Sequence, residues 1–209
     1  MVIDFKDIES SQLITGIPIV HYDSYLNNFE DRYGGKFYTK LLSITDKILS
    51  LDISKTPKYV FLCGMAGSGK SHFMVGLYRA LIYKLGYLQG EGALFTTFAS
   101  LSEEIIGMFK LDIPLRVSLK GFTQSKWLFL DDFTSSERVL KPDSLEYNMF
   151  RDILIDRYEK QNILITSSNI KSLDLLAEMD KLFGGYITSR LNDSEVISFP
   201  DKDFRRIKR

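Results

Sequence analysis

Cysteine is almost absent from this sequence, and the single thiol, Cys63, excludes an internal disulfide. Its place inside an apolar run is typical of a buried and chemically inert side chain. A net charge is missing too, because 27 Lys and Arg residues balance 27 Asp and Glu residues. This balance excludes an overall electrostatic attraction to nucleic acid, so any such affinity must come from a local patch.

Long hydrophobic runs are also missing. The sequence has neither a signal peptide nor a stretch long enough to span a membrane, which predicts a cytoplasmic protein with no membrane partner. The two histidines, His21 and His72, lack neighbours at the spacing of a metal or catalytic site. Hydrophobic residues make up 44% of the chain and charged residues 26%, as in ordinary globular proteins.

The most informative stretch runs from Lys58 to Gly86. The apolar residues 59–63 predict a strand buried on both faces. They are followed at once by GMAGSGKS, residues 64–71, which matches G-x-x-x-x-G-K-[ST] at every fixed position. Apolar residues then recur at helical spacing as far as Gly86. Strand, glycine-rich loop and helix in this order form the context of a phosphate-binding loop, which disfavours the alternative of a chance match in a turn.

The residue types of this loop suit a nucleoside triphosphate with Mg²⁺. Glycines let backbone N–H groups approach a phosphate, and the helix N-terminus turns its partial positive charge toward the same anion. Lys70 can reach the β- and γ-phosphates, and the Ser71 hydroxyl can ligate Mg²⁺. The predicted nucleotide-binding residues are Gly64, Met65, Ala66, Gly67, Ser68, Gly69, Lys70, Ser71 and His72.

A second motif follows another apolar run, residues 127–131, which reads WLFLD and predicts a strand. The strand ends in Asp131-Asp132, which resembles a Walker B element. Asp131 would hold Mg²⁺ through its water shell, and Asp132 would orient or deprotonate the attacking water. Acidic residues often end strands without any such function, but the phosphate-binding loop in the same chain favours the functional interpretation.

The other elements alternate between strands and helices, which predicts an α/β fold. We expect a three-layer P-loop NTPase with a five-stranded, mainly parallel sheet and no separate lid domain. Residues 111–126 show an irregular pattern, and residues 186–192 are helical or turn-like. Further strands are predicted at 93–98, 162–167 and 195–199, and further helices at 36–51, 100–109, 143–160 and 172–183. The helix at 100–109 would begin with a capping box formed by Ser100 and Glu103.

The strand at 162–167 ends in Ser167-Ser168-Asn169. Polar groups at the carboxyl end of a parallel strand lie at the edge of the sheet where ligands bind. Asn169 is therefore predicted to touch the γ-phosphate and the attacking water, with an ordinary strand-end turn as the alternative. The phosphate-binding loop and the Asp131-Asp132 pair are expected at the same edge.

Three regions are predicted along the chain: an N-terminal arm at 1–35, an ATPase domain at 36–200 and a basic tail at 201–209. The tail and the dispersed cations of residues 110–126 are two candidates for contact with DNA. A solvated surface is the favoured alternative for both. The cations concerned are Arg205, Arg206, Lys208 and Arg209 in the tail, and Lys110, Arg116, Lys120 and Lys126 in the irregular segment.

These motifs together resemble those of AAA+ ATPases. GMAGSGKS, WLFLDDF, ILITSSN and ITSRLNDSEVISF occur in the order seen in that family. The details are most similar to the DnaC/DnaI helicase-loader and IstB branch, which is related to the initiator DnaA. Two features carry this finer resemblance: Asp-Asp where most AAA+ proteins have Asp-Glu, and an upstream stretch formed by residues 15–18 and 26–29.

The resemblance implies ATP and Mg²⁺ as cofactors, with Asp132 as the catalytic carboxylate. It also implies that Arg190, in TSRLN, reaches into the ATP site of a neighbouring subunit; a surface salt bridge is the alternative. The catalytic set is then Lys70, Asp132, Asn169 and Arg190, with Ser71 and Asp131 at the metal. The implied partners are a replicative hexameric helicase, single-stranded DNA and further copies of the chain in a ring or spiral.

Two departures from this family pattern accompany the resemblance. We expect only a short arm where loaders usually carry a helicase-binding domain, and we expect no helical lid after Phe199. An IstB-like ATPase that binds duplex DNA and recruits a transposase is the main alternative. A small-molecule or nucleotide kinase is a further alternative, which the Asp131-Asp132 pair and Asn169 disfavour.

Overall fold

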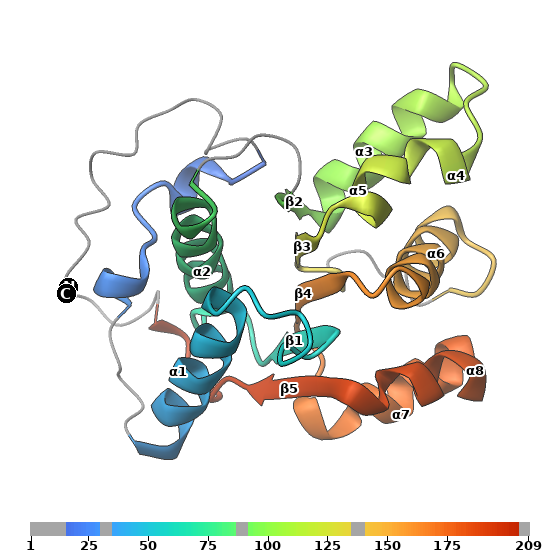
Figure 1. Ribbon diagram of the computed structural model, residues 1–209. Coiled ribbons are helices and arrows are strands. Elements are labelled where there is room, and N and C mark those ends of the chain that lie inside the picture. Colours follow the sequence, from blue (N-terminus) through green and yellow to red (C-terminus); the bar gives the residue numbers. More distant parts are fainter. Residues whose placement is uncertain (1–15, 30–34, 87–91, 135–140, 205–209) are drawn as a thin grey trace.

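The computed structural model describes residues 16–29, 35–86, 92–134 and 141–204. One sheet of five parallel strands, in the order β2-β3-β4-β1-β5, runs through the middle of the molecule (Figure 1). The strands are β1 (Tyr59–Cys63), β2 (Ala93–Thr97), β3 (Trp127–Asp131), β4 (Ile163–Ser168) and β5 (Ser194–Ser198).

Helices cover both faces of this sheet, which confirms the predicted three-layer α/β fold (Figure 1). On one face lie α1 (Gly35–Leu49) and α2 (Lys70–Lys84). On the other face lie α3 (Phe98–Phe109), α6 (Leu145–Glu159) and α7 (Ser172–Phe183), with the shorter α4 (Leu115–Ser118), α5 (Lys120–Gln124) and α8 (Gly185–Thr188). Among the described helices, none is long and apolar enough to cross a lipid bilayer.

The core is divided into two layers by the sheet. Because successive side chains of a strand point to opposite faces, β1 contributes Val60 and Leu62 to the layer under α1 and α2. Tyr59, Phe61 and Cys63 of the same strand pack in the layer under α3, α6 and α7. All five β1 residues are buried, so this strand, which lies between β4 and β5, has no polar face and reads as one apolar run in the sequence.

Two sequence predictions are wrong on the face of the sheet that is covered by α3, α6 and α7. Helix α3 begins at Phe98, directly after β2, and Thr97 is its cap, with the Ser100 N–H donating to Thr97 Oγ1 at 3.1 Å. Ser100 therefore lies inside the helix and does not open it. Residues 111–126 are not irregular throughout, because they form α4 and α5; each of these is too short to show a periodic apolar stripe.

The described part of the N-terminal arm, residues 16–29, packs along α2. It contains two 3₁₀ turns, η2 (Ile19–His21) and η3 (Leu26–Asn28). Arg79 of α2 donates to the Tyr22 carbonyl at 2.7 Å. Gly76 permits the close approach, since a Cβ at that position would lie 2.7 Å from the Leu26 nitrogen. Residues 1–15 and 30–34 of the predicted arm and the basic tail from Arg205 to Arg209 lie outside the described residues.

Candidate active site

The loop between β1 and α2 has the backbone that the glycine motif requires. Gly64, Gly67 and Gly69 have φ values of 148°, 80° and 96°, in the region that other residues rarely adopt. A Cβ on Gly64 would lie 2.8 Å from the Phe199 carbonyl oxygen. Gly69 is the N-cap of α2 and has no side chain to satisfy the first N–H groups of the helix. The loop and the helix N-terminus together form a cradle for an anion.

Lys70 sits at the start of α2 and is almost fully buried, with 7% of its surface exposed. Its Nζ donates to the Gly64 carbonyl at 2.7 Å and to the Met65 carbonyl at 2.9 Å. A third hydrogen bond, of 3.1 Å, joins Lys70 Nζ to Asn169 Oδ1 at the end of β4. The ammonium group is therefore held at the mouth of the loop, between β1 and β4.

The acid pair follows β3 at the same edge of the sheet. Asp131 is buried, and its Oδ1 accepts a hydrogen bond of 2.5 Å from Ser167 Oγ. Asp132 turns away from the strand with a φ of 53°, a left-handed conformation that is uncommon for a residue with a side chain. Burial and the neighbouring Asp131 charge raise the pKa of Asp132, while Lys70 acts in the opposite direction.

Asn169 connects the two halves of the site. Its Nδ2 donates to Asp132 Oδ1 at 3.2 Å, while its Oδ1 accepts from Lys70. Its own backbone N–H donates to Thr134 Oγ1 at 3.0 Å, which ties the end of β4 to the segment after β3. The structure thus brings together three of the four predicted catalytic residues, Lys70, Asn169 and Asp132, in one chain of hydrogen bonds.

Arg190, the fourth predicted catalytic residue, lies at the opposite edge of the sheet, where the strands begin. It belongs to the 3₁₀ turn η5 (Ser189–Asp193), which immediately precedes the first residue of β5. Its guanidinium carbon lies 5.1 Å from the centre of the Tyr158 ring, at the end of α6. Since a five-residue strand is about 16 Å long, Arg190 cannot reach the phosphate-binding loop of its own chain.

The side chain of His72, another residue predicted to bind the cofactor, turns toward the N-terminal arm. Its Nε2 lies 2.8 Å from Asn28 Oδ1 and 3.2 Å from the Tyr25 carbonyl oxygen. Phe29 of the arm packs edge-on against His72, with ring centres 5.5 Å apart. Only the main-chain N–H of His72, in the first turn of α2, therefore remains a candidate for phosphate binding.

The residues of the site fit a nucleoside triphosphate with Mg²⁺. The glycine cradle and Lys70 suit the phosphates, and the Ser71 hydroxyl and Asp131 carboxylate are oxygen ligands of the kind that Mg²⁺ prefers. No group of three or more His, Cys, Asp or Glu side chains among the described residues could hold a metal ion by itself. A bound Mg²⁺ would therefore depend on phosphate oxygens of the nucleotide, as is usual for this ion.

Sequence reasoning missed two side chains of the site, Ser167 and Thr134. Ser167 contacts both acids, because its Oγ donates to Asp131 and accepts from the Asp132 N–H at 2.8 Å. The sequence predicts that the polar end of β4 lies at the ligand-binding edge, but its pattern does not distinguish Ser167 from Ser168. Thr134 carries no sequence signal, since it lies beyond the Walker B-like strand in a loop.

Comparison with known proteins places this geometry on a recognised fold. No protein-family model matches the chain, and no curated protein sequence matches it. Among solved structures, a DnaC helicase loader is similar over 88% of this chain and 100% of that chain, with a TM-score of 0.69 and 20% identity. A DnaI structure is similar over 93% of this chain and 94% of that chain, with a TM-score of 0.58 and 14% identity.

The initiator DnaA shows the same likeness over part of its length. A DnaA bound to AMPPCP and single-stranded DNA is similar over 88% of this chain, with a TM-score of 0.62 and 15% identity. This chain spans about half of that DnaA, or 52%. Identities this low establish the fold alone. The chain therefore has the AAA+ P-loop ATPase fold, in the form seen in DnaC, DnaI and DnaA.

Proposed function

We propose that this protein is an ATP-dependent helicase loader that binds single-stranded DNA and loads or remodels a replicative hexameric helicase. The observation that carries the proposal is the hydrogen-bonded chain Lys70–Asn169–Asp132 at the mouth of a glycine-rich loop. This site lies on a fold that matches the whole length of a DnaC helicase loader. A protein with this activity would work in the cytoplasm, beside the replicating DNA.

In this proposal residues 36–200 form the ATPase domain and residues 64–72 bind the phosphates of ATP. Lys70 would exchange its hydrogen bonds to loop carbonyls for phosphate oxygens, which are stronger acceptors because they are charged. Ser71 and Asp131 would hold Mg²⁺, which supplies positive charge that stabilises the transferring phosphoryl group.

Asp132 would orient or deprotonate the attacking water, and Asn169 would contact it. The carboxylate of Asp132 accepts a hydrogen bond from the Asn169 amide at 3.2 Å, and the same amide accepts one from Lys70 at 3.1 Å. A raised pKa makes the Asp132 carboxylate a better proton acceptor than an ordinary surface aspartate. Asn169, which contacts both Lys70 and Asp132, is placed to respond to the γ-phosphate.

Hydrolysis would require assembly, because Arg190 lies at the far edge of the sheet. There it is only partly buried, against Tyr158. A guanidinium supplied to the ATP site of a neighbouring copy stabilises the transition-state charge. We therefore propose a ring or spiral in which the Arg190 edge of one copy faces the Lys70 edge of the next.

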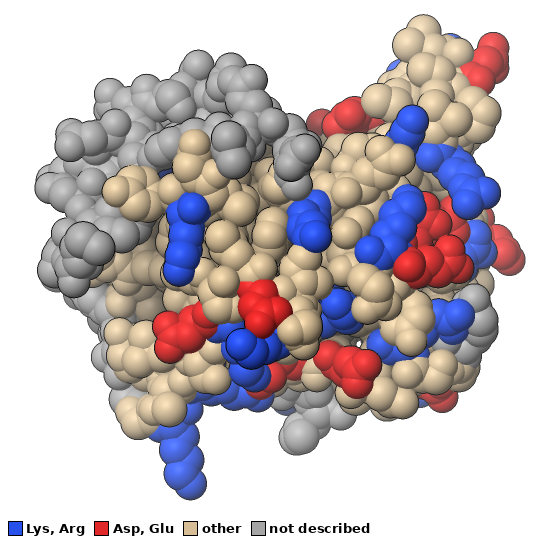
Figure 2. Space-filling view, viewed as in Figure 1, with Lys and Arg blue, Asp and Glu red and all other residues tan. Residues whose placement is uncertain are grey.

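Single-stranded DNA would bind along α4, α5 and the segments that flank them. The cations predicted there are all exposed: Lys110, Arg116, Lys120 and Lys126. Figure 2 shows that basic side chains on this side of the molecule are interspersed with acidic ones. Contacts to the DNA backbone would therefore be few, and binding would weaken only moderately with added salt.

Affinity capture in the presence of ATP and Mg²⁺ tests this function. The tagged protein, incubated with purified hexameric replicative helicases, should retain a helicase with ATP and release it with ADP. Lys70→Ala is the control, and it should capture much less. No helicase binding under any nucleotide condition would contradict the proposal. Tighter binding to duplex than to single-stranded DNA, with no helicase bound, would favour the transposition ATPase.

A further inference from the structure

The hydroxyl of Ser167, near the end of β4, contacts both acids of the site. Strand register places β4 beside β3, with Leu130 opposite Thr166, so Ser167 lies next to Asp131. Its Oγ is 2.5 Å from Asp131 Oδ1 and 2.8 Å from the Asp132 nitrogen. The Ser167 carbonyl oxygen also accepts the next N–H, from Phe133, at 3.1 Å.

The direction of these hydrogen bonds is fixed by chemistry. The Ser167 hydroxyl has a single proton, and it is donated to the carboxylate oxygen Oδ1 of Asp131. A backbone N–H can only donate, so a lone pair of the same hydroxyl accepts from Asp132. Ser167 is 1% exposed, and water therefore does not compete for either bond.

The two bonds have separate consequences. The first occupies Oδ1 of Asp131 and sets the orientation of its carboxylate, which leaves the other oxygen for a metal-bound water. The second bond, with the Phe133 bond, holds the backbone where Asp132 takes its left-handed conformation, φ 53°. That turn directs the Asp132 side chain to Asn169, 3.2 Å away.

We propose that Ser167 is a positioning residue, whose hydroxyl sets the metal-binding carboxylate of Asp131 and the catalytic turn at Asp132 with one pair of hydrogen bonds. This inference rests on the ATP hydrolysis proposed above, but not on the helicase or the DNA. Both partners of the Ser167 hydroxyl belong to the acid pair, and neither belongs to the phosphate-binding loop. Its loss should therefore change metal use and turnover, and leave the affinity for free nucleotide unchanged.

The neighbouring Ser168 provides a matched control. It is also fully buried, at 0% exposure, and its Oγ also accepts one backbone N–H, from Ile170 at 2.9 Å. The other contact of this hydroxyl is Thr134 Oγ1, at 3.4 Å, so its described partners include neither acid. Ser168→Ala therefore removes a similar buried hydroxyl from the same strand end without touching the Asp131-Asp132 pair.

The experiment compares Ser167→Ala, Ser168→Ala and the wild-type protein. Three quantities are measured: ATP affinity with EDTA present, the Mg²⁺ concentration that gives half-maximal hydrolysis, and kcat. Loss of a group that orients a metal ligand typically costs about 10- to 100-fold in metal affinity or activity. We expect a loss in this range for Ser167→Ala, with unchanged affinity in EDTA. Ser168→Ala should keep both the metal dependence and kcat, although the melting temperatures of the two variants fall alike.

Two further variants complete the test. Ser167→Thr retains a hydroxyl and should recover most of the turnover. Ser167→Cys nearly preserves the size of the side chain but is only a weak donor and acceptor, so it replaces the alanine variant if that protein does not fold. Equal losses in the Ser167 and Ser168 variants, or weaker ATP binding by Ser167→Ala in EDTA, would overturn the inference. A wild-type protein that binds no Mg²⁺ and ATP would overturn the proposed function as well.

Discussion

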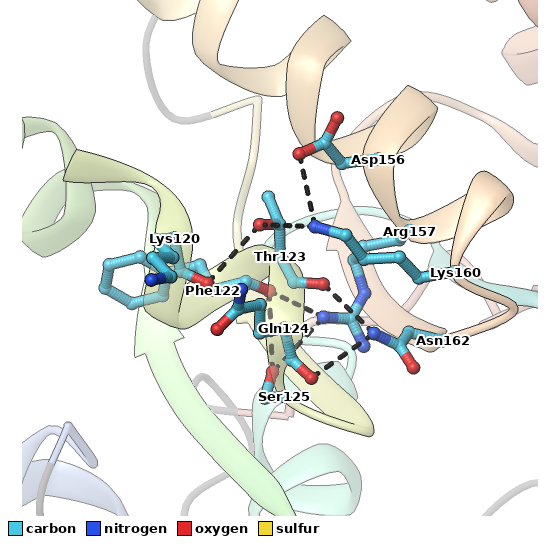
Figure 3. A network of polar contacts seen from close by, with 9 residues as sticks. All are labelled: Lys120, Phe122, Thr123, Gln124, Ser125, Asp156, Arg157, Lys160 and Asn162. Atoms are coloured by element: carbon cyan, nitrogen blue, oxygen red, sulfur yellow. Dashed lines mark hydrogen bonds and ion pairs between the residues drawn. The ribbon is translucent and has the colours of Figure 1, made fainter. Parts of the chain in front are cut away.

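The two edges of the sheet each hold a buried cation on backbone carbonyls, yet the two arrangements differ. At the carboxyl edge, Lys70 donates to two loop carbonyls and to the side chain of Asn169. At the amino edge, Arg157 of α6 is fully buried, at 0% exposure. It donates to the Phe122 carbonyl and to Ser125 Oγ (Figure 3). It also donates to the carbonyls of Lys126 and Ile163.

The partners of each cation indicate its role. Lys70 shares its site with an exposed amide and two acids, and an anion can take the place of its acceptors. The acceptors of Arg157 are mainly main-chain carbonyls that join the end of α5 to the start of β4, and no ligand can replace them. Burial lowers the pKa of Arg157 to about 9, so the guanidinium is still charged at neutral pH. A buried cation on carbonyls is therefore not by itself a sign of function.

Arg190 provides the strongest test of this contrast. It lies at the amino edge, as the structural cation Arg157 does, but is proposed to act in catalysis. Arg190→Ala should lower the turnover of the assembled protein by about 10³-fold or more. Its affinity for ATP should stay near that of the wild type, since the residue is remote from its own phosphate-binding loop. Steady-state hydrolysis and nucleotide binding, measured above the assembly concentration, give the two values.

Mixing provides the control for Arg190. Lys70→Ala retains Arg190, and Arg190→Ala retains an intact nucleotide site. A mixture of the two inactive proteins should recover part of the activity, because some neighbours then combine both groups. No recovery at any mixing ratio would indicate that Arg190 stabilises its own chain through Tyr158.

Arg157 should show the opposite behaviour, a large effect on stability and an indirect effect on chemistry. Arg157→Ala leaves several buried carbonyls without a donor, and we expect the free energy of unfolding to fall by about 3–5 kcal/mol. Urea denaturation monitored by circular dichroism measures this value. Arg151, on the same helix, pairs with Asp152 at the surface, and Arg151→Ala should cost less than about 1 kcal/mol. Lys70→Ala removes three hydrogen bonds, two of which are only partly buried, so it should cost less than Arg157→Ala in the same assay. An equal loss for Lys70 and Arg157 would contradict the contrast between the two cations.

The sequence carried enough information for the carboxyl edge and little for the amino edge. The glycine motif and the apolar strands predict their own backbone, because few other conformations satisfy G-x-x-x-x-G-K-[ST] between a strand and a helix. Asn169 could be predicted because parallel strands bring their ends together. Burial of Arg157 could not be predicted, since a charged residue on a helix normally faces water and its acceptors come from residues 122–126 and 163. Pairing of Ser167 with Asp131 depends on strand register, which no local pattern encodes.

The smallest expected effect concerns the packing of the N-terminal arm on α2, the helix that carries Lys70. A Cβ at Gly76 would meet the Leu26 nitrogen at 2.7 Å and the Tyr25 carbonyl carbon at 2.8 Å, both of which are backbone atoms that cannot rotate away. Gly76→Ala should therefore destabilise the protein by about 1–3 kcal/mol, despite the higher helix propensity of alanine. A Cβ at Gly107, in α3, would have open space around it within 4 Å, so Gly107→Ala should instead stabilise by up to about 1 kcal/mol. Changes of opposite sign in the melting temperatures of the two variants would show that the arm is packed against α2, the helix that positions the phosphate-binding loop. Changes of the same sign would show that the arm moves to accommodate the new Cβ, and that α2 is held by the core alone.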